Sequence, residues 1–202
     1  MSGLLLPLVC PGCGQDTLGS GPSRIYICPP CRTARFMERA EQLYPLVYLA
    51  ARPGPGSRLY APFWRLEGSV RWRVDDSAKE RAYRNTKPLG PLYFPAFWTP
   101  RVGHDENLTF RYGLLDSPPP EDPDARGDVL PGVLDPETLP EMARLTWLAH
   151  LDRVADVTGV QLEFSPGRIV YVAVPFLRSG ASWEDGVLGL RFPDAYFGTS
   201  AP

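Results

Sequence analysis

The sequence predicts a strand-rich α+β fold with short strands, hairpins and one long amphipathic helix, behind a small N-terminal unit that contains all the cysteines. Three observations lead to this fold class. The four cysteines fall in two C-x2-C pairs, and only one stretch of the sequence has a sustained helical pattern. The chain of 202 residues also contains 24 prolines, together with 5 Trp, 9 Tyr and 9 Phe. This proline content is about twice the usual share and favours short strands and rigid loops.

The four cysteines predict a zinc ribbon. Cys10 and Cys13 form the first pair, and Cys28 and Cys31 form the second. Four thiolates with this spacing suit a tetrahedral Zn²⁺ ion, with Zn–S distances of about 2.3 Å. Cysteines fill every coordination position, so the ion is expected to be structural and to stabilise a unit too small to bury a core of its own. The spacing leaves open an iron ion on the same ligands, and a redox dithiol or disulfides.

The residues around the cysteines predict two unequal zinc knuckles. Gly14 follows the first pair and allows the positive φ angle that such a turn favours. In the second pair Arg32 takes the equivalent position, and Pro30 removes an N–H that could have bonded a thiolate. The first knuckle is therefore expected to be better formed, and the cation of Arg32 could offset part of the negative charge of the site.

The zinc ribbon is expected to end near residue 45. Residues 24–27 have the composition of a strand, and residues 33–43 have a helical spacing of apolar side chains. Pro45 would end that helix. The predicted domains are residues 1–45, which hold the ribbon and this helix, and residues 46–202, a β-rich α+β domain that opens with a strand at 46–51.

Three similar aromatic segments are expected to build the second domain. Each carries Tyr, Pro and Phe on an apolar strand, then a loop and a second strand, and the pairs are residues 59–65 with 69–74, 92–98 with 108–112, and 170–178 with 187–192. The aromatics could form a stacking platform for bases or a peptide groove, but such residues usually carry much of a core's buried area. We therefore expect the following side chains to pack together in the core: Phe63, Trp64, Phe97, Trp98 and Phe176.

An acidic, proline-rich loop and the long helix follow. Residues 116–131 are too polar to pack a core, so this loop is predicted to be extended or mobile and dispensable for folding. Asp135 is a good N-cap for a helix that is predicted to reach about Val157. Its apolar face is predicted from residues that recur every three positions, namely Leu139, Met142, Leu145, Leu148, Leu151 and Val154. Residues 160–164 and 169–174 are then predicted to form a hairpin.

Charge is unevenly distributed along the chain. The net charge is −2 at pH 7, yet residues 1–101 carry 14 Lys and Arg against 7 Asp and Glu, and the remainder carries 7 against 16. The two halves could bind separate partners or attract each other within one fold. The densest basic region comprises Arg71, Arg73, Lys79, Arg81, Arg84 and Lys87. Because acidic residues interrupt it, a solvated face is favoured over a track of phosphate contacts.

Motifs of common enzymes are absent from the sequence. His104 and His150 are the only histidines and lie in no nucleophile or metal motif, and no phosphate-binding glycine-rich loop or G-x-S-x-G elbow is present. The longest apolar stretch, residues 43–51, is about half of what a bilayer requires. Residues 4–9 are too short for a signal sequence and follow no basic residue. The sequence thus predicts a non-enzymatic cytoplasmic protein without a membrane span.

The chain resembles a loose group of uncharacterised bacterial zinc-ribbon proteins. The four cysteines with Gly14 carry this resemblance, together with the Leu-Tyr-x-Pro-Phe-Trp-Arg segment at residues 59–65 and its weaker echo at 92–98. The resemblance implies the architecture and no particular activity. We expect a structural or protein-interaction subunit of a cytoplasmic assembly. The alternative is a nucleic-acid-binding module that uses the ribbon and the basic first half.

Overall fold

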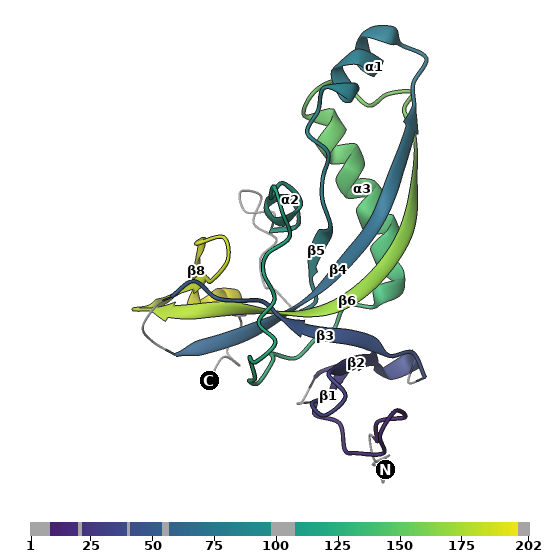
Figure 1. Cartoon of the computed structure of the whole chain (residues 1–202). Coiled ribbons are helices and arrows are strands. Elements are labelled where there is room, and N and C mark those ends of the chain that lie inside the picture. The colour runs from purple at the N-terminus through teal and green to yellow at the C-terminus, as the bar shows by residue number, and fades with distance from the viewer. Residues whose placement is uncertain (1–8, 20–21, 40, 54–56, 98–107, 198–202) are drawn as a thin grey trace.

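One eight-stranded sheet organises the protein in the computed structural model, which describes residues 9–19, 22–39, 41–53, 57–97 and 108–197 (Figure 1). The main path of the sheet is β1-β2-β3-β6-β4-β5, and β7 and β8 extend it from β6. The strands are β1 (Ile25–Cys28), β2 (Thr33–Phe36), β3 (Tyr44–Tyr48), β4 (Arg58–Arg73), β5 (Leu92–Pro95), β6 (Gln161–Ser179), β7 (Ser182–Asp185) and β8 (Arg191–Pro193). The strand-rich α+β class is confirmed.

Within the described residues, three helices accompany the sheet. They are α1 (Ser77–Arg84), α2 (Leu108–Gly113) and α3 (Leu139–Asp152), with single 3₁₀ turns η1 (Met37–Arg39), η2 (Pro136–Thr138) and η3 (Asp194–Phe197). Helix α3 packs along β4 and β6, whereas α2 contacts β5. Figure 1 shows α1 at one end of the molecule and the β1–β2 unit at the other.

The long strands β4 and β6 form the centre of the core. They pair antiparallel from Arg58 opposite Leu177 to Arg73 opposite Gln161. Because side chains alternate across a strand, the buried half of β4 supplies two separate apolar clusters. Trp64 belongs to the cluster on the α3 side, and Phe63 belongs to the cluster beneath α2 and the C-terminal strands.

The prediction that the aromatics form the core is confirmed for the described ones, but their expected grouping is wrong. Phe63, Phe97 and Phe176 share one cluster, and Trp64 lies on the opposite face of the sheet. Trp98 lies outside the described residues. Alternation along β4 separates two neighbouring aromatics that the sequence presents side by side.

Two predicted strand pairs are in fact continuous strands. Residues 59–65 and 69–74 were expected as two strands, yet β4 runs through both. The hairpin predicted around residues 165–167 is also wrong, because β6 passes through this segment without turning. Pro166 and Gly167 of β6 lie opposite the part of β4 between Leu66 and Gly68, where the register of the two strands shifts. The chain forms a bulge at this place and does not reverse. At Gly68 a Cβ atom would lie 2.4 Å from the ring of Phe164, so the bulge requires glycine.

Two other local predictions are wrong, and a third is correct only in part. Strand β2 and the turn η1 occupy residues 33–39, where the first part of a helix over 33–43 was predicted, because β2 pairs along its whole length with β1. Residues 108–112 lie in helix α2 and not in a strand. The strand predicted at 187–192 is limited to β8, which starts at Arg191. In each case pairing or packing with distant residues overrides the local pattern.

The long amphipathic helix is shorter than predicted. Asp135 acts as the predicted N-cap, since its Oδ1 accepts from the Glu137 N–H at 2.9 Å. However, this cap opens the turn η2, and α3 itself ends at Asp152. Its buried residues follow a spacing near four instead of three, so Leu145 and Val154 are 52% and 46% exposed. The buried residues are Leu139, Ala143, Trp147, His150 and Leu151.

The acidic, proline-rich segment 116–131 is extended but packed. The Ala50 N–H donates to the Pro120 carbonyl at 2.9 Å, and the Asp122 N–H donates to Tyr48 at 2.8 Å. Further along, the Leu130 N–H donates to Tyr60 at 2.9 Å. These backbone bonds fasten the segment to β3 and β4, so a composition too polar for a core still gives a fixed structure.

Strand β3 joins the N-terminal unit to the main sheet. It pairs antiparallel with β2, where Ala34 lies opposite Tyr44, and parallel with β6, where Leu46 lies opposite Tyr171. The predicted domain boundary at residue 45 therefore falls inside this strand. The cysteine-bearing unit is continuous with the sheet.

Candidate metal centre

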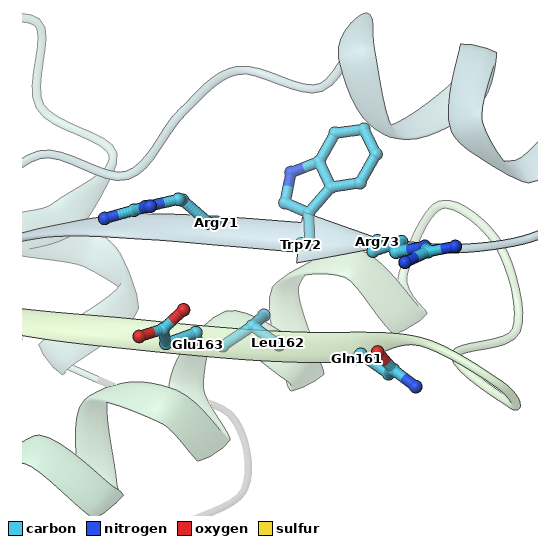
Figure 2. A pocket seen from close by; sticks show the side chains of 6 residues that line it. All are labelled: Arg71, Trp72, Arg73, Gln161, Leu162 and Glu163. Carbon is cyan, nitrogen blue, oxygen red and sulfur yellow. The ribbon is translucent and has the colours of Figure 1, made fainter.

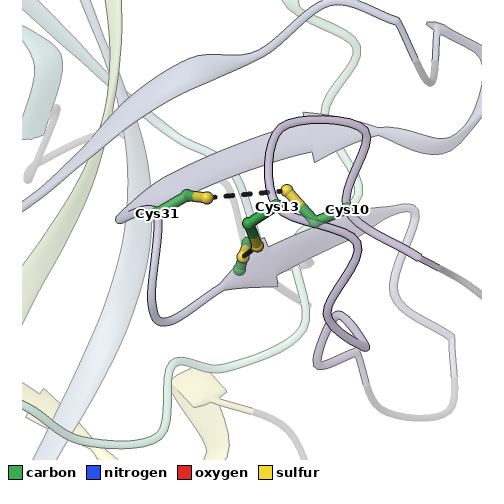
Figure 3. A group of neighbouring side chains, drawn as sticks. Cys10, Cys13 and Cys31 are labelled. Carbon is green, nitrogen blue, oxygen red and sulfur yellow. Dashed lines mark hydrogen bonds between the residues drawn. The ribbon is translucent and has the colours of Figure 1, made fainter.

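The four cysteine sulfurs gather in one cluster. Every pair of Sγ atoms lies within 4.8 Å, with 3.8 Å between Cys10 and Cys31 and 3.5 Å between Cys13 and Cys28 (Figure 3). A tetrahedral ion with metal–sulfur distances of about 2.3 Å requires sulfurs about 3.8 Å apart. The cysteines are free thiols, and these separations are far longer than a disulfide bond of about 2.05 Å. The cluster therefore has the donor set and spacing of a four-thiolate metal site.

Both knuckles are followed by a residue with positive φ, but different backbone hydrogen bonds close their turns. In the first, the Cys10 N–H donates to Gln15 and the Gly14 N–H donates to Cys10, both at 2.8 Å. Gly14 has φ of 73°, as predicted, and Arg32 has φ of 51° at the equivalent place in the second knuckle. The second knuckle thus has a left-handed residue at the same place, at a cost of about 1–2 kcal/mol for a residue that is not glycine. There the Arg32 N–H donates to the Pro29 carbonyl at 3.3 Å, one residue later than the equivalent acceptor in the first knuckle.

Contacts with the main sheet hold Arg32 in this conformation. Its guanidinium donates to the Pro123 carbonyl and lies 5.7 Å from the centre of the Tyr48 ring. Its own carbonyl accepts from the Leu46 N–H at 2.8 Å. The side chain expected to offset the charge of the thiolates is therefore bound to the segment 116–131.

Electrostatics within the cluster favour a bound cation. Burial opposes ionisation of the Cys10 thiol, but the N–H groups of Gly12 and Cys13 outweigh it and lower the pKa of Cys10 to about 6. The Cys13 thiol and burial raise the pKa of Cys31 to about 12, and burial raises the pKa of Cys28. The pKa is thus lowered at Cys10 and raised at Cys28 and Cys31, so a divalent cation would favour ionisation of the latter two thiols.

The predicted basic surface lies at the far end of the molecule from the cysteines. Arg71 and Arg73 are on β4, the next three residues are on α1, and Lys87 follows that helix. Four of the six carry an ion pair, and these are Arg73–Asp75 at 3.8 Å, Lys79–Asp156 at 3.0 Å, Arg84–Glu80 at 2.7 Å and Lys87–Asp116 at 2.6 Å. The structure brings the basic residues into one region but largely neutralises them.

A shallow hollow lies between β4 and β6 within this region (Figure 2). Arg71 is opposite Glu163 and Arg73 is opposite Gln161 in the strand register. Trp72 points to the α1 side, where its ring contacts Tyr83 with 5.6 Å between centroids. Mixed charges on an open face match a solvated surface better than a phosphate track.

Buried polar groups that the sequence did not single out form internal pairs. Tyr112 donates to both carboxylate oxygens of Asp185, at 2.8 and 3.1 Å, and burial raises the pKa of that carboxyl. Arg65 donates to Glu121 at 2.9 Å. His150 is hydrogen-bonded through Nε2 to the Lys87 carbonyl at 2.8 Å. Within the described residues, Nε of Arg65 and Nδ1 of His150 nevertheless have no hydrogen-bond partner.

Comparison with models of protein families, with curated proteins and with solved structures gives no significant match. Within the described ranges, none of the helices has the length and apolar character needed to cross a membrane. The site is therefore interpreted from its own geometry. His104 lies outside the described residues.

Proposed function

We propose that this chain is a structural zinc protein in which Cys10, Cys13, Cys28 and Cys31 bind one Zn²⁺ ion. The observation that carries this proposal is the convergence of four sulfurs at tetrahedral spacing from two knuckles. Soft thiolates select zinc or iron, and a closed four-cysteine set is typical of structural zinc. The ion would join the two knuckles and so stabilise the β1–β2 unit.

The unit built on these knuckles is proposed to bind another protein, without enzymatic activity, in a cytoplasmic assembly. Four of the six exposed large apolar side chains of the described chain belong to it, namely Val9, Leu18, Met37 and Leu43. Exposed apolar side chains concentrated on a small unit favour a protein partner over a polyanion. The neutralised basic region makes nucleic acid the weaker candidate.

The test is recovery of partners with the full-length protein from its native source, at low and at high salt. Leu18→Ser combined with Met37→Ser should abolish recovery of a partner that high salt does not release. Leu145→Ser, on α3, is the matched control, since that side chain is 52% exposed and Leu18 is 58% exposed. Recovery of nucleic acid alone, lost as salt rises, would support the alternative function.

A further inference from the structure

The N-terminal unit contains a buried cation without a counter-ion among the residues that the structure describes. Arg35, on β2, is 7% exposed, and its Nε–H is fully buried without a hydrogen-bond partner. Its guanidinium forms no ion pair within the described ranges. Arg65 is buried to the same extent, and it pairs with Glu121 at 2.9 Å. A guanidinium stays charged inside a protein, so Arg35 lacks the anion that a buried charge requires.

The tip of the Arg35 side chain is open to solvent. In the part of the chain that the structure describes, its two terminal nitrogens have no hydrogen-bond partner, and unlike Nε they are not fully buried. The side chain is therefore enclosed along its length and accessible only at the end. A carboxylate that reaches this end can accept two parallel N–H bonds from the guanidinium, the geometry in which arginine binds carboxylates most strongly.

Exposed apolar side chains lie on either side of Arg35. Tyr26 is opposite Arg35 in the β1–β2 register, and directly opposed residues share one face of a sheet. The Tyr26 hydroxyl contacts the sulfur of Met37 at 3.8 Å, and Met37 is 45% exposed. Continuing the β2–β3 register by one residue places Leu43, which is 37% exposed, on the other side of Arg35. The open guanidinium thus lies within an apolar surface.

A third exposed apolar side chain extends this surface across β1. Leu18 and Ile27 exchange two backbone hydrogen bonds, of 2.7 and 2.8 Å, so Leu18 lies beside the strand that carries Tyr26. The neighbouring Gly19 lies directly against the Tyr26 ring, because a Cβ atom there would be 2.3 Å from it. Leu18 is 58% exposed. The surface formed by Leu18, Met37 and Leu43 therefore surrounds one cation that lacks an anion.

We propose that Arg35 is the anchor of this surface and binds an acidic side chain, flanked by apolar residues, of the protein partner. The inference rests on the proposed function and adds the chemistry of the partner. Apolar residues of the partner would cover the exposed side chains, and its carboxylate would supply the missing counter-ion. Arginine is enriched among the residues that dominate binding at the centre of protein interfaces, where neighbouring apolar contacts exclude water.

The probe is a phage-displayed library of random peptides, selected on the full-length, zinc-loaded protein. Peptides that bind the parent but not Leu18→Ser combined with Met37→Ser report on this surface. They should share an Asp or Glu beside apolar residues. Arg35→Gln should weaken their binding by about 10–100-fold, which corresponds to the loss of hydrogen bonds to a charged group. Arg24→Gln is the control, since this side chain is 44% exposed and paired with Glu38, and it should leave the affinity unchanged.

A double-mutant cycle separates the contact from a structural role of Arg35. Changing the acidic residue of a selected peptide to its amide should weaken binding to the parent as much as Arg35→Gln does. The two changes together should cost no more than either alone. Arg35→Gln should retain the bound zinc and the melting temperature of the parent, because it removes an unpaired buried charge. Arg35→Lys, which retains the charge but not the paired N–H groups, should lose less affinity.

Different failures identify different errors. Equal affinity in Arg35→Gln, or losses that add in the cycle, would overturn the role of Arg35 while leaving the apolar surface in place. Selected peptides without an acidic residue would also overturn it, and this result does not depend on how the Arg35 variants fold. A selection in which Leu18→Ser combined with Met37→Ser loses no peptide would overturn the proposed protein-binding surface itself.

Discussion

Replacing Trp64 by Ala is expected to lower the free energy of unfolding by about 3–5 kcal/mol, the usual cost of truncating a large buried aromatic side chain. Trp64 is fully buried. Its ring meets those of Tyr44 and Tyr171 edge-on, with centroids 4.9 and 4.8 Å away. Its indole N–H donates to the Leu134 carbonyl at 2.9 Å. One side chain thus packs against β3, β6 and the segment before α3.

A second substitution separates the hydrogen bond from the packing. Trp64→Phe retains an aromatic ring but leaves the buried Leu134 carbonyl without its donor, which should cost about 1–3 kcal/mol. Trp72→Ala is the matched control, because it lies on the same strand, is only half-buried and packs against Tyr83 at the far end. It should cost less than Trp64→Ala.

The assay is equilibrium urea denaturation of the metal-loaded proteins, followed by circular dichroism. The midpoint should fall in the order parent, Trp72→Ala, Trp64→Ala, with little change in the slope of free energy against urea. An unchanged midpoint for Trp64→Ala, or one no lower than that of Trp72→Ala, would refute the assignment of Trp64 to the core.

Three further predictions concern the metal site, the acidic segment and the buried carboxyl. Changing Cys10 and Cys28 together to Ser should reduce bound zinc from one ion per chain to none by elemental analysis, and stoichiometric zinc in this variant would contradict the assignment. Replacing residues 118–124 by a Gly/Ser linker of equal length should lower the free energy of unfolding by about 1–3 kcal/mol, because Arg65 loses its Glu121 partner. An unchanged melting temperature would instead support the expectation that the loop is dispensable for folding. Burial raises the pKa of Asp185, so its contribution to stability is complete below about pH 4, the unfolded value, and declines as pH rises through the raised folded value. Asp185→Asn should remove this decline, so its stability relative to the parent should increase as the pH rises above about 4. Parallel curves of stability against pH for the two proteins would argue against this role of Asp185.

The candidate metal centre was largely predictable because its determinants are local. Two sulfurs three residues apart, with Gly14 after the first pair, define a turn that needs no distant contact. The position of the Arg32 side chain, in contrast, could not be predicted because it depends on the tertiary structure. Its guanidinium bonds to Pro123, which lies far along the chain.

The long strands were not predictable from local signals. A Ser-Pro-Gly sequence at residues 165–167 usually reverses a chain, yet here it forms a bulge inside β6. Pairing with β4 over most of its length outweighs the local preference for a turn. Residues 33–36 follow the same rule, because pairing with β1 overrides their helical spacing.

The sequence by itself predicted the four cysteines of the cluster, the strand-rich class and the N-cap at Asp135, since each depends mainly on residues within a few positions of one another. The tertiary structure decided which face of the sheet each aromatic side chain occupies and which cations are paired. Trp64 lies beside Tyr171 only because β4 and β6 share one register, and that register depends on contacts between residues about a hundred positions apart. The geometry of a short turn can be predicted from neighbouring residues in the sequence. Strand pairing instead depends on which apolar faces of distant segments pack together and exclude water.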